Sequence, residues 1–127
     1  MIYEKKRNGK YKYVTITEST YYTDIRPTSF IETEFITLSQ TGILTVKVDY
    51  AWDGPSGPAI DTENFIIPSL VHDALYQLIR LGLLIPKRKY RRQADWELFR
   101  FCHQNKMILP RKVWVWAGVR LLGWAYI

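Results

Sequence analysis

The chain has 127 residues, enough for one domain with its own core but too few for two. Hydrophobic residues make up 47% of it and aromatic residues 15%, which excludes a disordered protein. Its single cysteine, Cys102, excludes an internal disulfide and a zinc site built on cysteines.

The net charge of +6 is distributed unevenly. Residues 1–73 contain seven Lys and Arg against ten Asp and Glu, a balance of −3, whereas residues 74–127 contain eleven against two, a balance of +9. A cationic surface favours phosphate-bearing partners, either nucleic acid or anionic lipid headgroups, but a solvated basic face without a partner is as compatible with the pattern. No signal peptide is expected, and no window reaches the roughly 20 apolar residues of a spanning helix. We therefore expect a soluble or peripheral protein.

The first half predicts an antiparallel sheet of about four strands. Runs of β-branched and aromatic residues predict extended segments at residues 11–17, 21–23, 30–38 and 43–48, with residues 49–52 as an extension of the last one. A turn is expected at Asn8-Gly9, and Ser39 to Gly42 should close a hairpin between two of these segments.

Helical spacing follows in the second half. Ser69 is the expected N-cap of a first helix that Gly82 ends. A second helix fits residues 90–105 with Arg91, Arg92 and Arg100 on its outer face, and a third fits residues 111–124 with Pro110 at its start. The prediction is one α+β domain, with strands mainly in residues 1–53, a Gly/Pro loop at 54–68 and helices in 69–127.

The last segment, residues 113–127, is apolar nearly all round. It is expected either to pack against the other helices or another subunit, or to lie on a membrane surface, where tryptophan and tyrosine are enriched.

Residues able to do acid/base or metal chemistry recur between Tyr50 and Asp95. With Ser69 as the cap, His72 and Asp73 fall in the first helical turn, where the helix dipole favours a carboxylate and disfavours an imidazolium. Tyr76 shares their face of the helix. Asp95 comes after a short loop and one turn of the next helix, so two antiparallel helices would let it accept a hydrogen bond from His72.

These side chains predict a general base, a carboxylate that orients it, and a carboxylate that binds a metal, with carbonyls of the glycine loop as further ligands of a hard cation such as calcium. Such a set suits water attack on an ester. The alternative is structural: Asp73 complements a helix dipole, His72 is a satisfied core histidine, and Asp95 pairs with an arginine.

Four short motifs carry a resemblance to a known family: Asp53-Gly54-x-Ser56-x-Pro58, His72-Asp73-x-Leu75-Tyr76, Ala94-Asp95 and Val119-Arg120-x-x-Gly123. Together they resemble the signature of domain-of-unknown-function family 1353 of phages and prophages, over roughly residues 43–124. That family has no established activity, so the resemblance implies a phage or prophage origin.

The order and spacing of the candidate residues are also similar to those of phospholipase A2 domains, especially the ones in parvovirus capsids. The resemblance implies that His72 activates water and Asp95 orients it. It also implies that Asp73 holds calcium together with loop carbonyls from about Trp52 and Gly54.

Two functions are therefore expected as alternatives. One is a phage-encoded, virion- or tail-associated hydrolase with catalytic His72, Asp95 and Tyr76, dependent on calcium and acting on an ester of the cell envelope. The other is a non-catalytic structural component of a phage particle that binds other phage structural proteins. We expect the protein in the particle, or in the host cytoplasm before assembly. Contacts with anionic lipid or phosphate are predicted for the basic tract, Lys87, Arg88, Lys89, Arg91 and Arg92, and no specific nucleic acid is expected.

Overall fold

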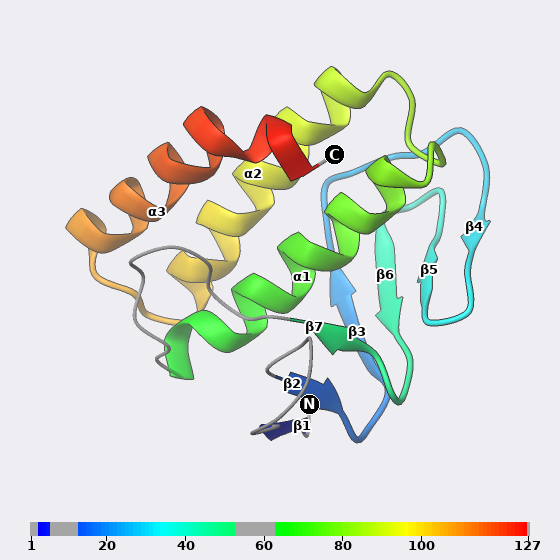
Figure 1. Cartoon of the computed structure of the whole chain (residues 1–127), viewed down its shortest axis with the longest axis horizontal. Coiled ribbons are helices and arrows are strands. Elements are labelled where there is room, and N and C mark those ends of the chain that lie inside the picture. The colour runs from blue at the N-terminus through cyan, green and yellow to red at the C-terminus, as the bar shows by residue number, and fades with distance from the viewer. Residues whose placement is uncertain (1–2, 6–12, 53–62, 127) are drawn as a thin grey trace. The chain divides into compact units, whose positions relative to one another are not determined.

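Strands precede helices in this chain, as the α+β prediction requires. The computed structural model describes residues 3–5, 13–52 and 63–126, so the predicted Asn8-Gly9 turn and most of the Gly/Pro loop lie outside the described residues. Within these residues seven short strands are followed by three helices, which confirms the predicted fold class (Figure 1). The chain divides into two compact units, residues 1–56 with the strands and residues 57–127 with the helices.

The strands form two antiparallel sheets, a division that the predicted sheet of about four strands did not contain. The first sheet has the order β1-β2-β7, from β1 (Tyr3–Lys5), β2 (Tyr13–Thr15) and β7 (Ala51–Trp52). The second has the order β3-β6-β5-β4, from β3 (Ser19–Tyr22), β4 (Ile31–Glu32), β5 (Ile36–Leu38) and β6 (Ile43–Val46).

A tight turn explains why the chain from Ile43 to Trp52 is not one strand. Asp49 has a φ of 70°, in the left-handed region that a β-strand cannot continue through. Thr15 holds this turn, because its hydroxyl donates to the carbonyl of Lys47 and accepts from the amide of Tyr50. The chain therefore leaves the second sheet after β6 and joins the first sheet as β7.

The predicted hairpin is confirmed in β5 and β6. Its turn needs Gly42, whose φ is 91°, and Gly42 donates its amide to the carbonyl of Ser39. Leu38 pairs with Leu44 across the two strands, and both side chains are fully buried.

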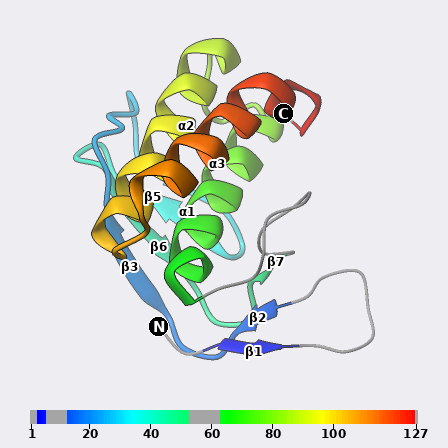
Figure 2. The ribbon, with the colours of Figure 1, turned by 90° about the vertical axis from the view of Figure 1, so that its left-hand side faces the viewer.

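Three helices form the second unit: α1 (Glu63–Arg80), α2 (Lys87–Gln104) and α3 (Leu109–Leu122), with a 3₁₀ turn, η1 (Gly123–Tyr126), after them. Helices α1 and α2 are antiparallel neighbours, and α3 packs on α2 (Figures 1 and 2). Gly82 ends α1 as predicted, with a φ of 75°, and Pro110 lies in the first turn of α3 as predicted.

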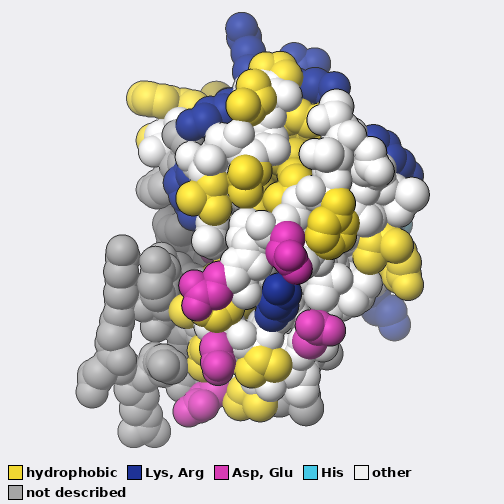
Figure 3. All heavy atoms as spheres, turned by 90° about the vertical axis from the view of Figure 1, so that its right-hand side faces the viewer, with side chains coloured by type: hydrophobic (Ala, Val, Ile, Leu, Met, Phe, Trp, Pro, Cys, Tyr) yellow, Lys and Arg dark blue, Asp and Glu magenta, His cyan; other side chains and the backbone are white. Residues whose placement is uncertain are grey.

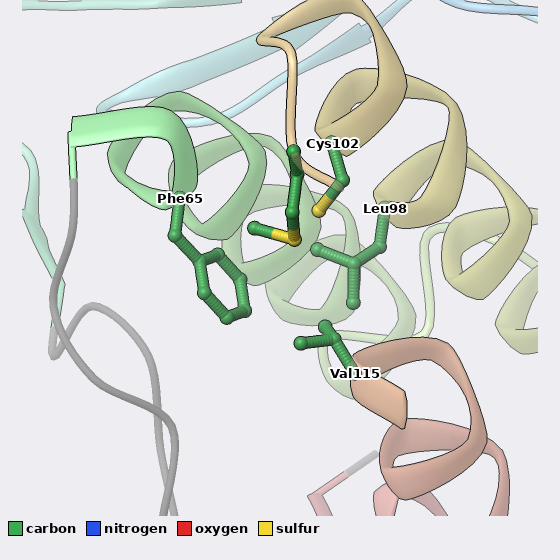
Figure 4. Close-up of a cluster of buried hydrophobic side chains, with 5 residues drawn as sticks. Phe65, Leu98, Cys102 and Val115 are labelled. Carbon is green, nitrogen blue, oxygen red and sulfur yellow. The ribbon is translucent and has the colours of Figure 1, made fainter. Parts of the chain in front are cut away.

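Helix α1 begins at Glu63, earlier than the predicted start after Ser69. The Ser69 hydroxyl donates to the carbonyl of Ile66 inside the helix and does not cap it. The additional turns are stabilised by Phe65, which packs with Leu98 and Cys102 of α2 in a buried apolar cluster (Figure 4). Met107 and Val115 complete that cluster and connect it to α3.

Candidate active site

The middle of α1 carries three of the predicted site residues: His72, Asp73 and Tyr76. The prediction that His72 and Asp73 lie in the first helical turn is wrong, because α1 starts at Glu63. The effect of a helix dipole falls off within the first turn, so it does not set the charge of His72. The immediate partners of the imidazole set it instead.

Asp95 of α2 is the centre of the site. Its side chain is fully buried, and Oδ1 lies 2.8 Å from Nε2 of His72. Tyr76 donates its hydroxyl to the same oxygen at 2.6 Å. The predicted hydrogen bond between His72 and Asp95 across two antiparallel helices is thus confirmed, and Tyr76 joins it because it stands one turn after His72.

The second carboxylate oxygen of Asp95 faces arginines. Arg120 of α3 donates from Nη1 to Oδ2 at 2.9 Å, and Nε of Arg91 lies 3.9 Å from the same oxygen. One buried carboxylate therefore joins all three helices of the unit.

Arg91 is not on an outer, solvated face, so that prediction is wrong. Its side chain is only 11% exposed, and Nη2 donates to the carbonyls of Val119 and Arg120 near the end of α3. Arg91 also stands one helical turn before Asp95, a spacing that indicates an ion pair and was available in the sequence. The other members of the basic tract, Lys87, Arg88, Lys89 and Arg92, are exposed as predicted.

Opposing effects act on the ionisation of the buried pair. Burial by itself disfavours the imidazolium, but the carboxylates of Asp73 and Asp95 outweigh it and raise the pKa of His72 above its usual value. Burial also disfavours the Asp95 carboxylate, yet His72, Tyr76 and Arg120 lower the pKa of Asp95. Burial and the hydrogen bond to Asp95 raise the pKa of Tyr76, so the phenol keeps its proton and donates it.

These shifts predict how stability depends on pH. The stabilisation from His72 is complete below 6.5, its unperturbed pKa, and is lost as pH rises through the raised pKa of the folded state. The stabilisation from Asp95 is complete above 3.8 and is lost as pH falls through its lowered pKa. We therefore expect the melting temperature to be highest between pH 3.8 and 6.5, as measured by circular dichroism.

The melting temperature of a His72→Gln variant should fall less above pH 6.5 than that of the wild type, because the contribution of the imidazole is gone. The control is His103→Gln, since His103 is the only other histidine of the chain and is exposed. If the melting temperature fell equally in the His72→Gln variant and the wild type, His72 would not be the group whose titration lowers stability above pH 6.5.

Gly123 permits the close packing of η1 on the site. A Cβ atom at this position would meet the hydroxyl oxygen of Tyr76 well inside contact distance, although the φ of −64° suits any residue. No individual role was predicted for Arg120 or Gly123. Their signal was the Val119-Arg120-x-x-Gly123 motif, which places an arginine and a small residue one turn apart.

We expect Gly123→Ala to lower the free energy of unfolding by about 1–3 kcal/mol, because Tyr76 must move away from Asp95. Gly118→Ala is the matched control, since nothing lies within 4 Å of its added Cβ and alanine is the better helix former. Denaturant titrations followed by circular dichroism should show the first variant destabilised and the second unchanged or more stable. Equal stability of the two variants would contradict the packing argument.

The proposed calcium ligands are only partly placed by the structure. Oδ1 of Asp73 lies 3.9 Å from Nδ1 of His72, and its side chain is 35% exposed. Trp52 belongs to the strand unit and Gly54 lies outside the described residues. Within residues 3–5, 13–52 and 63–126 no group of three or more His, Cys, Asp or Glu side chains is arranged to hold a metal ion. The described residues thus supply one carboxylate and do not complete a calcium site, which needs six to eight oxygens.

The two ring nitrogens of His72 face different carboxylates. Ionised Asp95 can only accept hydrogen bonds, so Nε2 must carry the proton between them. In the neutral ring Nδ1 is then the basic atom, and it lies on the side of the half-buried Asp73. A neutral imidazole with a fixed tautomer and an ionised carboxylate behind it is the arrangement of a general base.

No protein-family model, curated protein or solved structure matches this chain. What the site can do chemically therefore follows from its own geometry.

Proposed function

We propose that the helical unit carries a hydrolytic site in which His72 is the general base and Asp95 its orienting partner. The observation that carries the proposal is the 2.8 Å contact between Nε2 of His72 and the fully buried carboxylate of Asp95. A histidine held in one tautomer by a buried carboxylate is suited to taking a proton from water.

The step that suits this geometry is water attack on an ester. Nδ1 of His72 takes a proton from water as the water oxygen bonds to the ester carbonyl carbon. The same proton then passes to the alkoxide oxygen when the bond between that oxygen and the carbonyl carbon breaks. An acid and an alcohol result, and His72 returns to its neutral form.

The residues around the pair serve this step in different ways. Asp95 stabilises the imidazolium that forms, and Arg120 and Tyr76 hold the carboxylate in place. Tyr76 is therefore proposed as a positioning residue, because its raised pKa keeps its proton on the bond to Asp95.

The biological setting rests on the motif resemblances alone. The likeness to the phage and prophage family supports a phage-encoded protein, associated with the tail or another part of the virion. The likeness to phospholipase A2 domains supports an ester of the cell envelope as the substrate. It also supports calcium as a cofactor, with Asp73 as its ligand among the described residues. The step described above uses only His72 and water.

The proposal is tested by fatty-acid release from phospholipid vesicles, with calcium and with a chelator in excess. The wild-type protein is expected to release fatty acid, and the rate should rise with pH as Nδ1 of His72 loses its proton. If fatty acid is still released in the presence of the chelator, calcium is not required, and the role of His72 as the general base stands. No release from any ester-linked phospholipid, by a protein shown to be folded, would contradict the proposed substrate.

A second candidate, a non-catalytic component of a phage particle, is favoured by a specific observation. The Asp95 carboxylate of α2 accepts hydrogen bonds from side chains of α1 and α3, and the His72 side chain is only 8% exposed. Such a network can serve stability alone. Recovery of the protein in purified particles by mass spectrometry, together with a His72→Ala variant that loses only stability, would favour this function.

A further inference from the structure

One face of α3 is apolar and exposed. Val113, Trp114 and Leu121 are 46%, 54% and 72% exposed, and two more large side chains continue the face at the end of the helix and in η1. We call this set the α3 apolar face, and it consists of Val113, Trp114, Leu121, Leu122 and Trp124.

The three charged side chains of α3 are engaged elsewhere. Lys112 is buried and its amine lies 2.7 Å from Nδ1 of His103, while Arg120 binds Asp95. Arg111 lies over the ring of Phe65. No charged side chain of α3 therefore interrupts the α3 apolar face and favours its exposure to water.

Exposed basic residues adjoin the end of this face. Arg91 donates hydrogen bonds to the carbonyls of Val119 and Arg120, which brings the start of α2 to the end of α3. Lys87, Arg88 and Lys89 occupy the exposed first turn of α2, and that turn contains no acidic residue.

Figure 3 shows Lys and Arg side chains next to hydrophobic ones at the top of the molecule, where α2 begins in Figure 1.

We infer that the α3 apolar face docks on an anionic lipid surface, with Lys87, Arg88 and Lys89 against the headgroups. Tryptophan and leucine enter the boundary between headgroups and acyl chains, and nearby cations add attraction to anionic lipid. No described helix is long and apolar enough to cross a membrane, so the contact is made along the surface.

Charge favours a lipid surface over a second copy of the chain as the occupant. Residues 74–127 carry a balance of +9, so self-association through this region brings together two cationic surfaces. An anionic bilayer has the complementary sign. The inference goes beyond the proposed hydrolysis, because docking requires no turnover.

Vesicles of ether-linked lipids separate docking from hydrolysis, since they contain no acyl ester. Binding is measured by flotation and by tryptophan fluorescence, on vesicles of phosphatidylglycerol with phosphatidylcholine and on phosphatidylcholine alone. We expect the wild-type protein to bind the anionic vesicles more tightly, with the difference reduced at high salt. Equal binding to both compositions would overturn the inference.

Two kinds of variant test the two parts of the surface. Leu121→Glu should weaken binding by at least about tenfold, because a buried leucine contributes that much and the new charge is repelled. The matched control is Phe30→Glu, an exposed apolar residue of the strand unit, which should bind as the wild type does. Neutralising Lys87, Arg88 and Lys89 with glutamine should cost about fivefold for each charge on anionic vesicles.

Two results would contradict docking through the α3 apolar face. Unchanged binding of the Leu121→Glu variant would overturn the role of the α3 apolar face. A wild-type protein that sediments as a dimer, ignores anionic vesicles and becomes monomeric with Leu121→Glu would assign the face to a second copy instead. Because neither measurement involves a reaction, a protein that docks without hydrolysing esters would contradict only the proposed function.

Discussion

Replacing Asp95 with alanine is expected to lower the free energy of unfolding by about 3–5 kcal/mol, the largest effect on stability of any single substitution in the site. The variant leaves the hydroxyl of Tyr76, the ring of His72 and the guanidinium of Arg120 without their common acceptor. The guanidinium groups of Arg91 and Arg120 then lose the carboxylate that balances their positive charge. Urea unfolding followed by circular dichroism measures the loss.

Two comparisons make this experiment specific. Glu34→Ala removes an exposed carboxylate and should change stability by no more than about 0.5 kcal/mol. Arg120→Gln should cost less than Asp95→Ala, because 28% of the arginine side chain is exposed and water can replace part of its contact.

A double-mutant cycle of Asp95→Asn and Arg120→Gln isolates the pair. We expect the two changes to be non-additive by about 0.5–3 kcal/mol, since each removes the same ion pair. Strict additivity, or an Asp95→Ala variant as stable as the wild type, would show that Asp95 does not join the helices.

Replacing His72 with alanine is expected to reduce ester hydrolysis by about 10²–10⁴-fold, the usual contribution of a positioned general base. The substitution removes Nδ1 and leaves Asp95 with Tyr76 and Arg120 as partners. Rates are measured below the melting temperature of the variant, so that lost activity is not lost fold. Asp95→Asn should fall in the same range, because its amide cannot stabilise the imidazolium.

His103→Ala is the matched control for this loss. His103 is exposed and contacts Lys112, away from the pair, so its removal should leave the rate unchanged. The pH profile gives an independent readout, since the wild-type rate should increase through the raised pKa of His72. A His72→Ala variant that is less stable but equally active would assign the network to stability alone.

Local patterns in the sequence predicted much of the helical unit. The glycine at position 82 and the short loop before α2 predicted two antiparallel helices, and the separation of 23 positions from His72 to Asp95 then predicted their contact. The hairpin of β5 and β6 was predicted by its β-branched residues and by Gly42. Each of these features depends on residues close in the chain, whose preferences are set by backbone sterics and side-chain spacing.

Other features depended on contacts between distant segments. The start of α1 was mispredicted because Ser69 is a favourable cap in isolation, whereas burial of Phe65 against α2 stabilises helix before Pro68. Arg91 was assigned to solvent because a basic run usually lies on a wet face. Only the packing of α3 on α2 provides the carbonyls that draw this arginine inward.

In the stretch from Tyr50 to Asp95, some features were likewise set by local sequence and others by contacts with distant segments. The sequence by itself determined the fold class, the antiparallel α1 and α2, and a histidine within reach of an aspartate. The tertiary structure alone decided the rest of the site: Arg120 on the second oxygen of Asp95, Gly123 beneath Tyr76, and a histidine whose pKa is raised where a helix start would have lowered it. The physical reason is that the ionisation of a buried carboxylate depends on every charge around it, and Arg120, which completes that set, lies 25 residues further along the chain in α3.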